Sequence, residues 1–160
     1  MAFSKKRICK GRSRLIRRRS VLPLGNYSPA SYPPNFSDST NSMTITVPQT
    51  GTVSNVILSI SFSTHGYNSI LIESPIGTRL TMISNLLGTV GGGFIFDDNG
   101  GPIPPSDPTP SGTYSPNQLL SGFDGESVNG DWIVEVTDNT TLNGGGPGTT
   151  ITNVTLNIDF

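Results

Sequence analysis

The sequence predicts an all-β fold, and three observations lead to that prediction. Nineteen glycines and thirteen prolines accompany abundant serine, threonine and asparagine, and 33% of the residues are apolar. This composition is typical of many short strands joined by turns. Apolar and polar residues alternate in several short runs, which is the period of a half-buried strand. No segment has the wide apolar stripe of an amphipathic helix. The length of 160 residues suits one domain.

The first strands are expected soon after Met43, where the alternation begins. Ile45 and Val47 alternate with threonines, and the same period runs from Val56 to Phe62. We therefore expect two strands here, separated by a turn at 48–51.

A hairpin is expected next, around the sequence Ser-Pro-Ile-Gly-Thr. Pro75 and Gly77 suit a tight turn, and the apolar runs 70–73 and 80–84 flank it. A further short run lies at 94–96, and the alternation returns at 154–160. With the strand at Trp132, we expect seven or eight strands in all.

The stretch from Leu119 to Val136 contains the only tryptophan, which we expect to lie at one end of the core. Its glycines give a loop with backbone freedom, which leads into the alternating run that starts at Trp132. A large aromatic at this position usually buries its rings while its N–H finds a hydrogen-bond partner. We interpret Trp132 as a core anchor.

The charges divide the chain into a cationic arm and an acidic body. After residue 20 the chain has one cation, Arg79, against eleven acids, so this part has a formal charge of −10. The other nine cations all lie in the first twenty residues: Lys5, Lys6, Arg7, Lys10, Arg12, Arg14, Arg17, Arg18 and Arg19. Like charges at this density repel each other, so we expect an extended arm whose role is docking.

Three interpretations of the arm stay open. It is a solvated tail without a partner, or it neutralises phosphates of a nucleic acid without reading bases, or it inserts into an acidic groove of a protein assembly. Its charges fall all around a helical wheel, which argues against a membrane-surface helix. No long apolar run follows these charges, so we expect no membrane partner and no secretory signal.

We predict three segments along the chain. Residues 1–20 form the basic arm. Residues 21–42, rich in proline and serine and without periodicity, form a semi-extended linker. Residues 43–160 form the β-domain.

Between about Met43 and Phe160 the chain resembles the P domain, or homo B domain, of proprotein convertases. It is most similar to bacterial versions that are appended to secreted subtilisin-like proteases and surface proteins. Residues 1–42 have no counterpart, and Asn68 and Ser69 stand where the family commonly places an acidic residue. The matching positions are His65, Ser74, Pro75, Gly77, Thr78, Asp97, Asp98, Gly122 to Gly125, Asn129, Gly130, Trp132 and Asp138.

The resemblance implies a jelly-roll-like β-sandwich of about eight strands. It also implies that the domain is not catalytic, because the P domain supports a neighbouring catalytic domain. On this basis we assign structural roles to five residues: His65, Pro75, Gly77, Gly130 and Trp132.

The residues themselves also argue against an enzyme. One histidine, His65, and one cysteine, Cys9 in the arm, offer little for nucleophilic catalysis, and no zinc-protease or phosphate-binding motif occurs. We expect no catalytic residue and no certain cofactor.

Asp97 and Asp98 carry the only metal prediction. Followed by Asn99 and Gly100, they form an oxygen-rich turn of the kind that binds calcium. The alternative is that these carboxylates accept backbone N–H bonds and cap turns. Both interpretations stay open at this point.

Our main functional hypothesis is a non-enzymatic structural protein of a virus particle, such as a bacteriophage capsid decoration or fibre module. The arm would anchor it to other virion proteins or to nucleic acid, within an oligomeric assembly, after synthesis in the host cytoplasm. The alternative is a secreted accessory P domain that acts with a separate subtilisin-like protease, or a secreted surface-binding module. A sequence-independent nucleic-acid binder is a further alternative.

Overall fold

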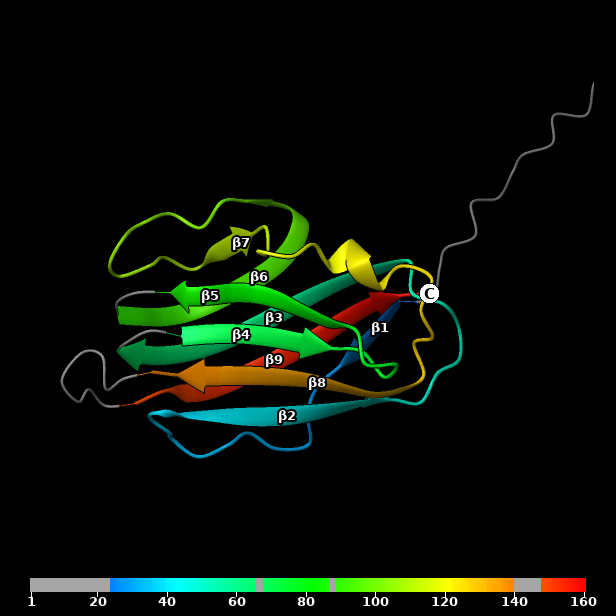
Figure 1. Ribbon diagram of the computed structural model, residues 1–160, viewed down its shortest axis with the longest axis horizontal. Helices are drawn as coiled ribbons and strands as arrows, with labels where there is room; N and C mark the ends of the chain where they lie inside the picture. Colours follow the sequence, from blue (N-terminus) through cyan, green and yellow to red (C-terminus); the bar gives the residue numbers. More distant parts are fainter. Residues whose placement is uncertain (1–23, 66–67, 87–88, 140–147) are drawn as a thin grey trace, which may run out of the picture.

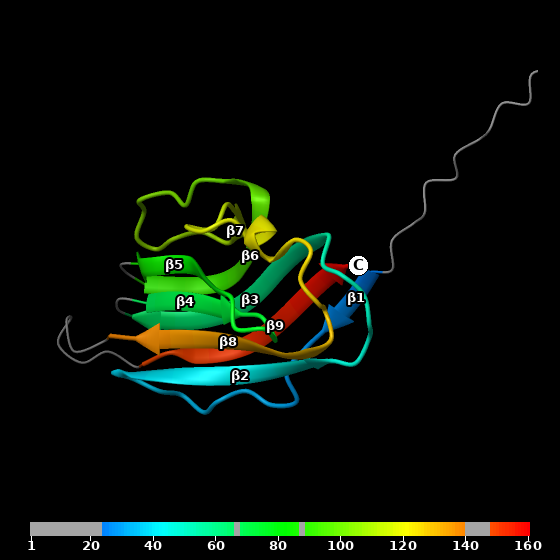
Figure 2. The ribbon, with the colours of Figure 1, turned by 45° about the vertical axis from the view of Figure 1, so that its right-hand side comes forward.

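Two β-sheets face each other in a sandwich (Figures 1 and 2). The computed structural model describes residues 24–65, 68–86, 89–139 and 148–160. In this part of the chain one sheet has the strand order β1-β9-β3-β6-β7 and the other β2-β8-β4-β5. The predicted all-β sandwich is confirmed, with nine strands in the described ranges. These are β1 (Leu24–Tyr27), β2 (Ser39–Val47), β3 (Asn55–His65), β4 (Asn68–Glu73), β5 (Arg79–Leu86), β6 (Thr89–Gly101), β7 (Gly112–Tyr114), β8 (Gly130–Asp138) and β9 (Thr150–Asp159).

The core forms from the apolar half of each alternating run. Leu58 and Ile60 of β3 point inward and are buried, as are Val134 and Val136 of β8 in the opposite sheet. Because successive side chains of a strand point to opposite faces, these runs bury one face and leave serine, threonine and asparagine on the other. The alternation that predicted the strands therefore also selects the core residues.

Trp132 lies at one end of this core with no exposed surface. Its indole N–H donates to the carbonyl of Val128 at 3.1 Å. The ring meets Phe123 edge-on, with centroids 5.1 Å apart. Phe123 belongs to the single 3₁₀ turn of the described residues, η1 (Leu120–Phe123), in the loop before β8. The indole thus has both the burial and the hydrogen bond that such a ring needs.

The hairpin β4–β5 turns at Ser74–Gly77 as the sequence predicts. The N–H of Gly77 donates to the carbonyl of Ser74 at 2.9 Å, and Gly77 has a φ of 91°. Pro75 packs against the start of β8, where a Cβ on Gly130 would lie only 2.8 Å from the Cβ of Pro75. Gly130 also has a φ of 129°, which favours glycine. Pro75, Gly77 and Gly130 thus fit together at one corner.

The sandwich begins earlier than Met43, so the expected boundary between linker and domain is corrected. β1 pairs antiparallel with β9, from Leu24 opposite Asp159 to Tyr27 opposite Leu156. The ring of Tyr27 folds back over Gly25, where a Cβ would lie 2.1 Å from the tyrosine oxygen. Burial raises the pKa of Tyr27 above its usual value of 10.0.

The segment between β1 and β2 also belongs to the sandwich. Phe36 is buried in the core and bridges to Thr149 through two backbone hydrogen bonds. The hydroxyl of Tyr32 accepts the N–H of Val154. The prolines of this segment suggested a linker, but an edge segment needs few regular backbone bonds and tolerates proline.

Candidate functional site

Four buried polar residues meet at the end of the sandwich where β3 and β8 finish and β4 and β9 begin. This polar cluster consists of Thr64, Asn68, Asp138 and Thr149, each at most 1% exposed. The hydroxyl of Thr149 lies 2.6 Å from Oδ2 of Asp138, 2.8 Å from the hydroxyl of Thr64 and 3.0 Å from Oδ1 of Asn68. The amide of Asn68 donates to the Thr64 hydroxyl at 2.9 Å.

Hydrogen bonds within the polar cluster connect four strand ends. A buried carboxylate loses its hydration, and hydrogen bonds from the protein must replace it. Thr149 donates its hydroxyl to Asp138, the hydroxyl of Thr64 in β3 is hydrogen-bonded to the Thr149 oxygen, and the amide of Asn68 in β4 donates to Thr64. Such an arrangement stabilises the strand ends that meet here.

His65 ends β3 next to the polar cluster, and its backbone pairs with Thr89. Its side chain lies outside what the structure describes, so its assigned structural role stays a prediction. Within the described ranges, no group of three or more histidine, cysteine, aspartate or glutamate side chains could hold a metal ion. In the same ranges, no helix has the length and apolar character that crossing a membrane requires.

Asp97 and Asp98 make the contacts of capping residues. Oδ1 of Asp97 accepts the N–H of Asn99 at 2.8 Å, which closes a local turn. The two oxygens of Asp98 accept the N–H groups of Leu120 and Ser121 at 2.6 and 2.8 Å, at the start of η1. These are the contacts of the capping interpretation, and calcium binding at Asp97 and Asp98 stays a prediction.

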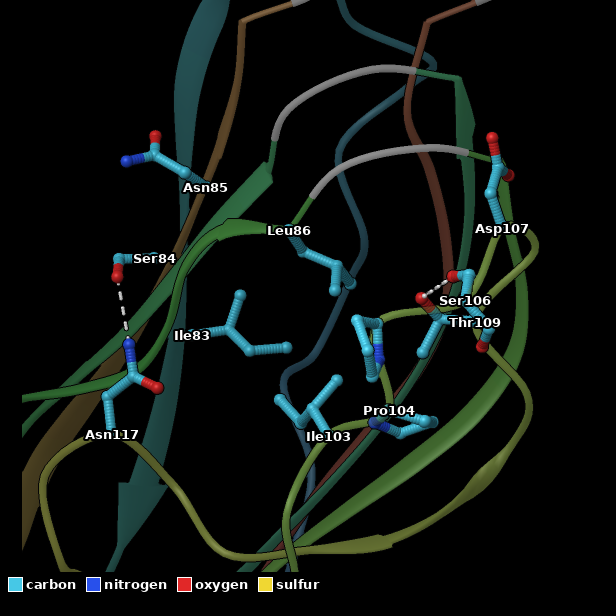
Figure 3. A pocket seen from close by; sticks show the side chains of 11 residues that line it. Ile83, Ser84, Asn85, Leu86, Ile103, Pro104, Ser106, Asp107, Thr109 and Asn117 are labelled. Atoms are coloured by element: carbon cyan, nitrogen blue, oxygen red, sulfur yellow. Dashed lines mark hydrogen bonds between the residues drawn. The ribbon is translucent and has the colours of Figure 1, made fainter.

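A pocket of about 370 Å³ opens between the end of β5 and the loop that follows β6. Figure 3 shows the side chains of Ile83, Leu86, Ile103 and Pro104 directed toward its interior. A volume of this size is at the lower end of the range for ligand-binding pockets, which are mostly apolar with a few polar groups at fixed positions. The pocket is therefore shaped to accept an apolar group.

The rim of the pocket is polar. On one side the amide of Asn117 donates to the hydroxyl of Ser84 at 2.8 Å, and on the other stand Ser106 and Asp107 (Figure 3). Asn85, also at the rim, has a φ of 53°, a left-handed conformation that asparagine adopts more readily than most residues. Among the residues that line the pocket, only Asp107 has a charged side chain.

The described part of the chain is strongly acidic, and Arg79 is its one cation. The guanidinium group of Arg79 lies 3.2 Å from a carboxylate oxygen of Glu73 and 2.5 Å from one of Glu135, across β5, β4 and β8. The nine cations predicted to anchor the protein or to contact nucleic acid all precede residue 24 and lie outside the described residues.

Neither the polar cluster nor the pocket was predicted from the sequence. Thr64 and Thr149 are two of many threonines, and no periodicity marks the residues that a fold brings together at strand ends. The pocket depends on how a proline-rich loop folds over β5. The one available signal was Asp138, which belongs to the resemblance stated above.

The chain matches no protein-family model and no curated protein sequence. Two structures from Aeromonas sobria are among the solved structures to which its fold is similar. One is a serine protease of Aeromonas sobria, with 18% identity and a TM-score of 0.50. The other is the complex of the Aeromonas sobria serine protease with its chaperone, with 20% identity and a TM-score of 0.50. Each match covers 86% of this chain and 26% of the other chain, so this chain spans about a quarter of the chains it matches.

These similarities correct the main functional hypothesis. The two similar structures named above are those of a bacterial serine protease and of its complex with a chaperone, and neither is a viral structural protein. The hypothesis of a capsid decoration or fibre module, and with it the virion location, was wrong. The cause is that it relied on the basic arm and the apparent lack of a secretory signal, which are properties of the first residues and not of the folded domain.

Proposed function

We propose that this chain is an accessory β-sandwich domain that acts with a subtilisin-like serine protease, as P domains do. The observation that carries the proposal is the structural match, in which most of the described sandwich corresponds to a quarter of a serine protease chain. The hairpin turn at Ser74–Gly77, Gly130 and Trp132 support it, because these matching motifs meet in one packed structure. The expected partner is a protein, and the expected location is outside a bacterial cell.

We also propose that the domain has no catalytic activity of its own. The sequence contains a single histidine and a single cysteine. Among the described residues, the buried carboxylate of Asp138 is bonded to the Thr149 hydroxyl inside the polar cluster. A carboxylate held in this way supports strand ends rather than a reacting group.

A complementation experiment tests the accessory role. The Aeromonas sobria serine protease is expressed without the segment that matches this chain, alone or together with this chain. We expect the protease activity recovered in soluble form to rise at least about tenfold when this chain is present, because an accessory domain stabilises the folded protease.

The matched control replaces Trp132 by alanine, which removes the core anchor and with it the folded sandwich. This variant should give no recovery of activity. Equal activity with and without the intact chain would contradict the accessory role. Labelling of the chain alone by a fluorophosphonate, which reacts with activated serines, would contradict the lack of catalysis.

A further inference from the structure

The pocket beside β5 has the chemistry to bind an apolar side chain that has basic neighbours. Its interior is formed by Ile83, Leu86, Ile103 and Pro104, and the charged group at its rim is the carboxylate of Asp107. The body around it has a formal charge of −10. Apolar contacts would hold the anchor, while the acidic surroundings favour cations beside it.

We propose that this pocket binds the segment Phe3–Lys10 of the same chain. The segment has the sequence Phe-Ser-Lys-Lys-Arg-Ile-Cys-Lys, in which Phe3 and Ile8 are apolar and four residues are cationic. Either apolar side chain suits the interior of the pocket, and the neighbouring cations face the carboxylate of Asp107 at its rim. The basic arm then serves as an internal ligand that covers the pocket.

The distance from Leu24 to the pocket determines which part of the arm can reach it. Leu24 pairs with Asp159 at one end of β9, whereas Leu86 pairs with Asn68 at the opposite end of the sandwich (Figure 1). The arm must therefore run along a ten-residue strand, about 33 Å. Ile16 is eight residues from Leu24 and reaches at most about 29 Å, whereas Ile8 is sixteen residues away and reaches at most about 58 Å.

This inference does not depend on the accessory role. It concerns contacts within one chain, and complementation of the protease can succeed or fail without affecting it.

Partial digestion of the full chain by trypsin tests the proposal. Nine of the ten trypsin sites lie in the arm, and the tenth, Arg79, is in β5 and ion-paired. Cleavage of a docked segment follows the population of its released form. At low salt we expect initial cleavage after Lys5, Arg7 and Lys10 to be at least about fivefold slower in the wild type than in Asp107→Lys, in which the segment is released from the pocket.

Two substitutions of equal charge separate the pocket from general attraction. Asp107→Lys reverses the charge at the rim, and Asp124→Lys makes the same change at an exposed residue outside the pocket. Only Asp107→Lys should speed the cleavage. Equal rates in the wild type and both variants, or equal acceleration in both variants, would overturn the proposal.

Substitutions in the arm keep the test valid if Asp107→Lys impairs folding. Replacing Phe3 and Ile8 together by serine should release the segment, whereas replacing Leu15 and Ile16 by serine should leave the protection intact. The opposite result would overturn the choice of segment. Protection that grows with protein concentration would show docking between two chains and would overturn binding within one chain.

Discussion

Asp138 is a buried carboxyl group that is surrounded by polar residues. Its carboxylate has no exposed surface, and its neighbours in the polar cluster are small hydrogen-bonding residues. Thr64, Asn68 and Thr149 come from three different strand regions and meet only in the folded chain. Removing any one of them leaves polar atoms buried in a space that water does not hydrate.

Replacing Thr149 by valine should destabilise the protein by about 3 kcal/mol, because the isosteric side chain leaves the buried Asp138 without the hydroxyl 2.6 Å away. The free energy of unfolding in urea measures the effect. Thr152→Val is the matched control, since this threonine is exposed and its hydroxyl lies 3.2 Å from the carbonyl of Ser61. A loss of equal size in both variants would contradict the role of the polar cluster.

Replacing Asp98 by alanine should lower the free energy of unfolding by about 1–2 kcal/mol, because the N–H groups of Leu120 and Ser121 lose their acceptors. Thermal melts in millimolar calcium and in a chelator distinguish the two interpretations of Asp97 and Asp98. Capping alone predicts the same melting temperature in both. A higher melting temperature in calcium, lost in the Asp98 variant, would establish the cation site.

At the residue level, the sequence predicted positions with unusual chemistry and missed those with ordinary chemistry. Trp132 is unique, so its burial and its bonded N–H could be anticipated. Gly77 and Pro75 follow from turn geometry. Thr149 has no such mark, because its importance depends on Asp138, which lies across the cluster and becomes a neighbour only in the folded chain.

The strand β8 depends on how it starts, at the corner formed with the β4–β5 hairpin. Gly130 has a φ of 129°, and Pro75 occupies the space that its side chain would need. Trp132, the first bulky core residue of β8, comes two residues after Gly130. A substitution that distorts this corner would therefore displace β8.

Replacing Gly130 by alanine should destabilise the protein by about 1–3 kcal/mol, because it combines an unfavourable φ with a contact of 2.8 Å to Pro75. Chemical denaturation measures the loss. Gly101→Ala at the end of β6 is the control, since a Cβ there meets nothing within 4 Å. If both variants had the stability of the wild type, the corner would not be constrained in this way.

Among the elements, the long alternating strands were predictable and the short edge elements were not. β3 alternates from Val56 to Phe62 and β9 from Val154 to Ile158, because each has one buried face along these residues. β1 has only four residues, and one of them is Gly25, so no period can be recognised. Its place in the sheet follows from pairing with β9, which is a tertiary interaction.

At the scale of the whole molecule, residues 24–42 complete the sandwich. β1 pairs with β9, Phe36 fills part of the core, and β2 begins at Ser39. A domain that starts at Met43 would lack all three. It would also expose the edge of β9, and exposed edges favour aggregation.

The fragment 43–160 should therefore be less stable than the fragment 24–160. Burial of Phe36 alone is worth about 2–3 kcal/mol, and the lost pairing of β1 adds to this. Urea denaturation and light scattering of the two fragments measure stability and aggregation. Equal unfolding midpoints would mean that the domain boundary at Met43 was right.

The pairing of Leu24 with Asp159 places the two ends of the folded domain side by side (Figure 1). A short glycine-rich connection could therefore join them, and a new start and end could be opened in the exposed loop 48–50 between β2 and β3. Such a circular permutant would keep every strand pair in place. The order of the strands along the chain can thus change while their arrangement in the fold stays the same. Because its two ends are adjacent, the domain can be inserted into a loop of another protein as readily as added to its end.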